Sequence, residues 1–202
     1  MQRSNKFSTF DMCAAGLLLA MFFLSGNVIP AIQLIPKVPI TLQTMVIALT
    51  GVLLGSRRGG LTVLALYFIT LAGVPVFSAF GAGPAVFGRP SVGYTLGFLP
   101  MALITGLYPS VWSRLKKGTP REVWSRIILA LLCFAAIAAD YTCGAAGYIA
   151  ATGGTAGFWV SLANAFTFLP ADAVKMAVVV ALAPQLLHIK AGITAPVRVR
   201  SK

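Results

Sequence analysis

The sequence is poor in acidic residues, histidine and cysteine, and these shortages exclude several kinds of site. Its 202 residues include four Asp or Glu, one His and three Cys. A single histidine, His188, excludes an HExxH zinc site, and its place at the end of the last apolar segment excludes a Ser/His dyad on the far side of a membrane. Cys13, Cys133 and Cys143 lack metal-ligand spacing and are expected to be small buried residues. We therefore expect no metal, no cofactor and no enzyme.

The chain also has few charges of either sign and is rich in apolar residues. Charged residues make up 10% of it, against about 25% in an ordinary soluble domain. Hydrophobic residues make up 58%, and the mean hydropathy is +0.88. This composition is typical of an integral membrane protein. The length indicates a single membrane domain over residues 1–202.

Six apolar segments predict an all-α integral membrane protein with six transmembrane helices. The first is about as long as a bilayer core requires and lacks a small-residue cleavage site, so we expect a spanning helix rather than a signal peptide. The second is short for a span, and the last is too long for one straight helix and is expected to break near Pro170. The predicted spans are 10–29, 40–54, 59–77, 92–112, 127–151 and 158–189.

The formal net charge of +12 follows the expected topology and does not indicate nucleic-acid binding. All but three of the 16 Lys and Arg residues lie near the termini or in connections that six crossings place on one side. The positive-inside rule puts that side, with both termini, in the cytoplasm. The same residues can also contact anionic membrane lipids or a cytoplasmic partner. They are Arg3, Lys6, Arg57, Arg58, Arg114, Lys116, Lys117, Arg121, Arg126, Lys190, Arg198, Arg200 and Lys202.

Ionisable residues inside the apolar segments indicate a binding site. Asp172 and Lys175 are three residues apart in the last segment, so both lie on one helical face. A charge at the centre of a spanning helix costs about 2.5–3.5 kcal/mol, so it should face the protein interior and a partner or ligand. Asp140, in the fifth segment, can pair with a cation, contact ligand or bond a neighbouring helix. The other cations that depart from the charge bias are Lys37 and Arg89.

Two connections on the opposite side contain polar and aromatic residues that simple spacers would not require. The first contains KVPITLQT, with the polar groups of Thr41 and Gln43, and the second is the Gly- and Pro-rich stretch 73–98 with Arg89. Its aromatic residues can form walls for a small molecule, or simply an interfacial belt. They are Phe77, Phe80, Phe87 and Tyr94.

Five stretches, in this order, resemble the BioY family, the biotin-binding S components of energy-coupling factor transporters. VPITLQT (38–44) is similar to the family's first-loop motif, GVPVF (73–77) to the end of its third helix, and GRPSVGYTLGF (88–98) to its GPTGGYLLGF-like segment. Tyr141 and Gly144 resemble its Y-x-x-G pattern, and PADAVK (170–175) its P-G-D-x-x-K motif. The resemblance extends from about Gly16 to Lys175.

The resemblance implies an S-component-like bundle that binds biotin and imports it through the cytoplasmic membrane of a prokaryote. It assigns Asp172 and Lys175 to the vitamin. We add Arg89 as a candidate for the valerate carboxylate, with supporting contacts from Gln43, Thr41, Tyr94 and Asp140. The implied partners are a transmembrane coupling subunit and two ATPases that use the ATP, because this chain has no GxxxxGK[ST] loop. Gly16 and Ala20 resemble the small-residue surface on which such subunits dock, although they also suit internal packing.

Four alternatives stay open at this point. The chain can be an S component for another vitamin, or can transport biotin without ATPase partners. An intramembrane lipid-modifying hydrolase would use Asp140 and Asp172. A purely structural helix-packing protein is disfavoured by the cost of placing Asp140, Asp172 and Lys175 in lipid.

Overall fold

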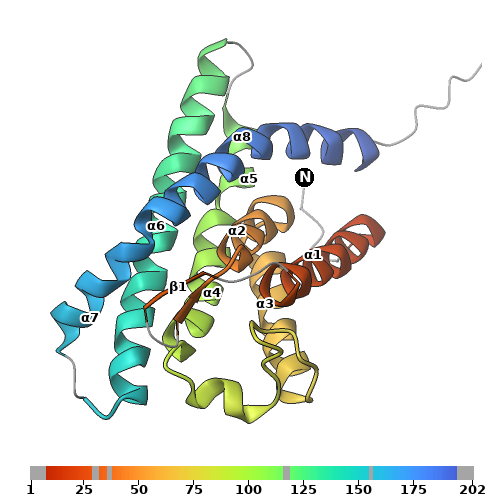
Figure 1. The fold of residues 1–202 in the computed structure, drawn as a ribbon. Coiled ribbons are helices and arrows are strands. Elements are labelled where there is room, and N and C mark those ends of the chain that lie inside the picture. Colours follow the sequence, from red (N-terminus) through yellow and green to blue (C-terminus); the bar gives the residue numbers. More distant parts are fainter. Residues whose placement is uncertain (1–7, 29–31, 36–37, 116–118, 155–156, 195–202) are drawn as a thin grey trace, which may run out of the picture.

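A computed structural model describes residues 8–28, 32–35, 38–115, 119–154 and 157–194. The protein is a helical bundle with one short hairpin between its first two helices (Figure 1). The elements, in chain order, are α1 (Thr9–Asn27), β1 (Ile32–Ile35), β2 (Val38–Ile40), α2 (Gln43–Leu54), α3 (Ser56–Leu71), the 3-10 helix η1 (Pro84–Gly88), α4 (Val92–Thr105), α5 (Tyr108–Arg114), α6 (Thr119–Ala151), α7 (Phe158–Ala165), η2 (Phe166–Phe168) and α8 (Leu169–Thr194).

Four helical stretches of the described chain are long and apolar enough to cross a membrane: Thr9–Asn27, Val92–Arg114, Glu122–Ala151 and Phe158–Thr194. Gln43–Leu54 is apolar but shorter. With α2 and α3 as short passes, six helical passes fit the predicted fold class. The hairpin departs from a purely α chain: β1 and β2 pair antiparallel, with Ile32 opposite Ile40, because β-branched residues on both sides of the turn favour strands. The side of the membrane on which the termini lie stays a prediction.

Local sequence explains where several helices begin and bend. Ser8 caps α1, and its hydroxyl oxygen accepts from the backbone N–H of Asp11, whose carboxylate accepts from Ser8 in return. Gly55, with a φ of 82°, permits the reversal between α2 and α3. Pro170 is the second residue of α8, directly after the 3-10 turn η2. Pro184 lies inside α8, which changes direction along its length in Figure 1.

Two helix boundaries differ from the sequence-based segments. α6 begins at Thr119, before the expected start at residue 127, so Glu122 lies in its first turn. α3 ends at Leu71, and the stretch expected to continue it to residue 77 turns away at Gly73, whose φ is 97°. A positive φ suits glycine and stops the helix.

Glycines bring α4 and α6 into backbone contact. A Cβ atom on Gly147 would overlap with the backbone of Gly93, and one on Gly93 would overlap with the carbonyl of Cys143. Gly144 likewise leaves room for the ring of Tyr94. The two helices therefore form a closely packed seam along one side of the bundle, which we call the α4–α6 seam.

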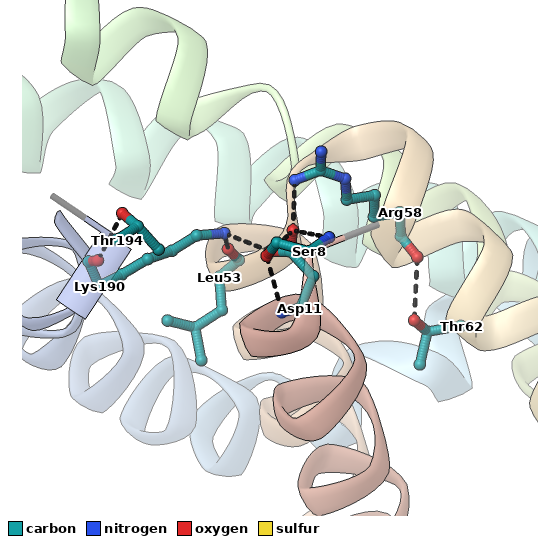
Figure 2. Close-up of polar contacts among 7 residues, drawn as sticks. All are labelled: Ser8, Asp11, Leu53, Arg58, Thr62, Lys190 and Thr194. Carbon is teal, nitrogen blue, oxygen red and sulfur yellow. Dashed lines mark hydrogen bonds and ion pairs between the residues drawn. The ribbon is translucent and has the colours of Figure 1, made fainter. Parts of the chain in front are cut away.

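A polar cluster joins four helix ends at the end of the bundle where α1 begins (Figure 2). The Asp11 carboxylate accepts from Arg58 Nη1 at 2.7 Å and from Lys190 Nζ at 3.0 Å. Lys190 also donates to the carbonyl of Leu53 at 2.6 Å. The cluster ties the start of α1 to the ends of α2 and α8 and the start of α3. We call it the Asp11 cluster.

Candidate ligand-binding site

A cavity lies between α2, α4, α6 and α8, at the end of the bundle opposite the Asp11 cluster. It is partly covered by β2 and the connection between α3 and α4. Both charged residues of the last segment face it, together with hydroxyl, amide and aromatic groups. Its lining consists of Ile40, Thr41, Gln43, Thr44, Phe77, Ser78, Ser91, Tyr94, Thr95, Phe98, Asp140, Tyr141, Phe168, Asp172 and Lys175.

Asp172 and Lys175 form a buried ion pair in this cavity. Lys175 Nζ lies 2.7 Å from Asp172 Oδ1, and the two side chains are 8% and 6% exposed. Thr44 donates to Asp172 Oδ1 at 3.2 Å and accepts from Lys175 at 3.4 Å. The hydroxyl of Tyr141 donates to Asp172 Oδ2 at 2.8 Å. Both oxygens of Asp172 therefore have partners within the protein, whereas an ammonium has three donors and Lys175 uses two of them.

Two other polar side chains of the lining keep unused atoms. Asp140 is 2% exposed and Gln43 is 3% exposed. Asp140 Oδ1 and Gln43 Nε2 are buried without a hydrogen-bond partner among the described residues. Both side chains line the cavity, although Asp140 Oδ1 lies against Gly97 of α4 and Gln43 Nε2 lies against Gly26 of α1.

Aromatic residues form the apolar walls, but they are only partly those expected. Phe77 and Tyr94 line the cavity as anticipated, and the ring of Tyr94 contacts that of Phe168 edge-on at 5.9 Å. Phe80 is exposed, and neither it nor Phe87 belongs to the lining. Phe98 and Phe168 take their place. Phe98 is one turn beyond Tyr94 on the same helix face, so helical spacing would have identified it.

Sequence reasoning also missed Thr44 and Tyr141 as members of the site. Tyr141 was noted only as part of the Y-x-x-G pattern, and Thr44 only as the last letter of VPITLQT. Tyr141 bonds to Asp172 from 31 residues away in the sequence, and Thr44 bonds to it from 128 residues away. Contacts over such separations depend on how the helices pack, and neither residue has a local signal.

The remaining candidates divide between the cavity and its surroundings. Thr41 lines the cavity and its hydroxyl bonds the Gln43 side chain at 3.2 Å. Arg89 does not line it: Arg89 Nη1 donates to the backbone oxygen of Ser78, a lining residue, at 3.0 Å. Lys37 lies outside the described residues. The cavity thus brings together six of the seven predicted contacts: Asp172, Lys175, Gln43, Thr41, Tyr94 and Asp140.

The surface features lie apart from this cavity. Gly16 and Ala20 are exposed on one face of α1, and a Cβ on Gly16 would meet nothing within 4 Å. His188 packs edge-on against Trp112 at 5.2 Å, as suits a side chain near a helix end. Cys133 is buried, but Cys13 is exposed, so the expectation that all three cysteines are buried is wrong. α1 lies at the edge of the bundle, and its outer face has no neighbour in the described chain.

Comparisons with known proteins agree with this architecture. The sequence model of the BioY family matches residues 1–191. A biotin transporter BioY of Rhizobium etli is 34% identical over 178 residues, covering 87% of this chain and 91% of the relative. One of Lactococcus lactis is 30% identical and covers 88% of each chain. One of Rhodobacter capsulatus is 42% identical over 92 residues, about half of either chain (46% and 48%).

A solved structure has the same fold. The crystal structure of the S-component for biotin from an ECF-type ABC transporter superposes with a TM-score of 0.74, covering 91% of this chain and 95% of that chain. The sequence identity is 24%. This similarity therefore supports the arrangement of the helices.

The apolar helical bundle and its buried charged cavity define a multi-pass membrane protein built to hold a small polar molecule. The sequence comparisons then identify its family. The chain belongs to the BioY family. Members of this family are transport proteins, so the alternative of an intramembrane hydrolase is excluded.

Proposed function

We propose that this protein binds biotin with high affinity and takes it up across the cytoplasmic membrane. The observation that carries the proposal is the buried Asp172–Lys175 pair in a partly aromatic cavity of a BioY family member. The named relatives are biotin transporters, which supports biotin over other vitamins.

The cavity offers the kinds of group that biotin needs. Biotin has a ureido ring with two N–H donors and a carbonyl acceptor, an apolar thioether ring and chain, and a carboxylate. Carboxylate and ammonium groups such as Asp172 and Lys175 can bond these polar ends. Gln43, Thr41 and Tyr94 would give supporting contacts, and the Phe side chains an apolar trough. Arg89 lies beside lining residue Ser78 and is the candidate for the valerate carboxylate.

Uptake needs energy that this chain has no sequence motif to supply. In the proposed complex, a transmembrane coupling subunit and two cytoplasmic ATPases provide it. The exposed Gly16 and Ala20 of α1 form the proposed docking surface, because small residues allow another helix to approach closely. The proposed topology puts the basic helix ends and both termini in the cytoplasm, near the ATPases.

A competition experiment on the purified protein tests the ligand. Radiolabelled biotin is bound in detergent, and unlabelled biotin, thiamine, riboflavin or niacin is added. We expect only biotin to displace the label at low concentration, and biotin to be recovered unchanged. Displacement by another vitamin at lower concentrations than biotin would assign the protein to that vitamin.

Uptake in cells lacking their own biotin importer tests the energy source. We expect accumulation of radiolabelled biotin when this chain is produced with the coupling subunit and ATPases, and little without them. Equal accumulation in both strains would show transport by this chain alone, the second function considered from the sequence. Protein levels in the membrane fraction serve as the control.

A further inference from the structure

We infer that a groove on the outer surface of α6 and α8 binds an anionic phospholipid, with the phosphate at Arg126 and an acyl chain lying between the two helices. The groove is separate from the cavity described above, because the two share no lining residue. Its ligand is thus a component of the membrane around the protein and not a transported molecule.

The groove forms where α6 and α8 separate toward the start of α6 (Figure 1). Its lining residues recur every three or four positions, so they form one face of α6 and one face of α8. The side chains of Cys133, Ile137 and Met176 are buried and form its floor. Ala173 and Ala177 are exposed along its rim and are too small to fill it, which leaves a volume of about 460 Å³.

The groove faces the bilayer, and its surroundings determine what fills it. Apart from Arg126, the described lining is apolar. The hydrocarbon core holds no water, and an unfilled space would forfeit van der Waals contacts, so the expected occupant is a lipid acyl chain. The proposed docking helix α1 lies on the other side of the bundle (Figure 1), so a partner bound there leaves the groove open to lipid.

Arg126 supplies the charge that selects the lipid. Its side chain is exposed and makes no ion pair or hydrogen bond with another described side chain. Glu122, one turn earlier on α6, does not pair with it. A guanidinium without a protein partner can bond a phosphate through two parallel N–H groups. An anionic headgroup therefore suits this end of the groove.

Two observations place Arg126 at the depth of the lipid headgroups. Trp124, two residues before it, is 58% exposed, and exposed tryptophans are enriched at the interface between bilayer and water. The stretch of α6 from Arg126 to Ile137, the last α6 residue of the groove, is about 16 Å long, close to half of a hydrocarbon core of about 30 Å. The groove thus spans one leaflet, which is the cytoplasmic leaflet in the proposed topology.

Native mass spectrometry of the full-length protein in detergent tests the headgroup. The probes are phosphatidylglycerol, which is anionic, and phosphatidylcholine, which is zwitterionic, with identical acyl chains. We expect the native protein to bind phosphatidylglycerol about five-fold more tightly, the usual effect of one basic residue at an anionic surface, and Arg126→Gln to lose this preference. Arg114→Gln, which changes an exposed arginine of α5 outside the groove, is the matched control and should keep it.

A second pair of variants tests the acyl chain. Ala177→Phe places a ring in the groove and should weaken the binding of both lipids by about ten-fold, because the chain and the ring compete for one space. Ala138→Phe adds the same ring to an exposed position of α6 outside the lining and should bind both lipids as the native protein does. Thermal unfolding shows whether each variant is folded, and the arginine variants decide the question if Ala177→Phe is not.

Several results would overturn the inference. Equal affinity of the native protein for the two lipids, or a preference that persists in Arg126→Gln, would remove the phosphate from Arg126. Unchanged lipid binding by a folded Ala177→Phe would place the acyl chain elsewhere. A lipid-free dimer of the native protein that Ala177→Phe disrupts would assign the groove to a second copy of the chain.

Discussion

At the scale of single residues, the two carboxylates of the cavity differ in the side chains that bond to them. Asp140 and Asp172 both follow an alanine in apolar sequence and look alike there. Only the packing of α2 and α6 against α8 supplies Thr44 and Tyr141 to Asp172. The sequence predicted that both carboxylates face a ligand, and could not predict their different surroundings.

We expect Asp172→Asn and Lys175→Ala each to abolish biotin retention, a loss of at least about 100-fold, while membrane insertion stays intact. Breaking a buried pair leaves an uncompensated group and typically costs about 3–5 kcal/mol. Equilibrium binding of radiolabelled biotin measures the loss, with Lys190→Ala as the control because that lysine pairs with Asp11 outside the cavity. Native affinity in either cavity variant would refute the assigned role.

At the scale of helices, the α4–α6 seam depends on glycines that meet backbone to backbone. The sequence makes no prediction for these glycines, because their spacing does not indicate which helices meet. Gly93 lies in a segment that resembled the family and Gly147 does not, yet the backbone of Gly93 occupies the space in which Gly147 would have a side chain.

Gly147→Ala should destabilise the protein by about 1–3 kcal/mol, the usual cost of overpacking, because its Cβ overlaps with the Gly93 backbone. Thermal unfolding in detergent measures this change. Gly192→Ala is the matched control, since a Cβ there meets nothing within 4 Å and alanine favours the helix. Equal melting temperatures for Gly147→Ala and the native protein would argue against the seam.

The Asp11 cluster makes a second prediction for helices. Asp11→Asn keeps the size of the side chain but removes the charge that holds Arg58 and Lys190. We expect a loss of about 2 kcal/mol in the free energy of unfolding, as for hydrogen bonds to charged groups. Glu122→Gln removes the exposed acidic residue of α6 and should have little effect in the same thermal assay. A similar loss from both variants would mean that net charge, and not the cluster, is responsible.

At the scale of the whole molecule, the helical class followed from the apolar segments of the sequence, and the burial of Asp172 and Lys175 in an internal cavity followed from the cost of placing charge in lipid. The hairpin of β1 and β2 and the split between α4 and α5 did not follow, since short elements there depend on neighbouring helices. Arg89 was expected at the ligand because of its exceptional charge. Its bond to Ser78 depends on the fold of the connection and has no signal in the sequence.

The proposed docking surface gives a prediction for the assembled transporter. Gly16→Leu adds a bulky side chain to the exposed face of α1, where a Cβ would meet none of the described residues within 4 Å. We expect normal biotin binding by the variant alone but loss of co-purification with the coupling subunit and of uptake. Ala138→Leu, at an exposed position of α6, is the control. Undiminished co-purification of Gly16→Leu would move the docking surface elsewhere.

The α4–α6 seam also limits which side of the cavity can change shape. Where two helices touch through their main chains, no side chains lie between them that can rearrange. We therefore expect this side of the cavity to be rigid. The connection between α3 and α4 supplies Phe77 and Ser78 to the cavity lining and is tied to α1 by a bond from the Phe80 N–H to Asn27 Oδ1. The helix proposed to dock with the energising subunits thus also contacts the connection beside the cavity, through Asn27 and through the rings of Phe22 and Phe23, so a shift of α1 would be felt at the cavity lining.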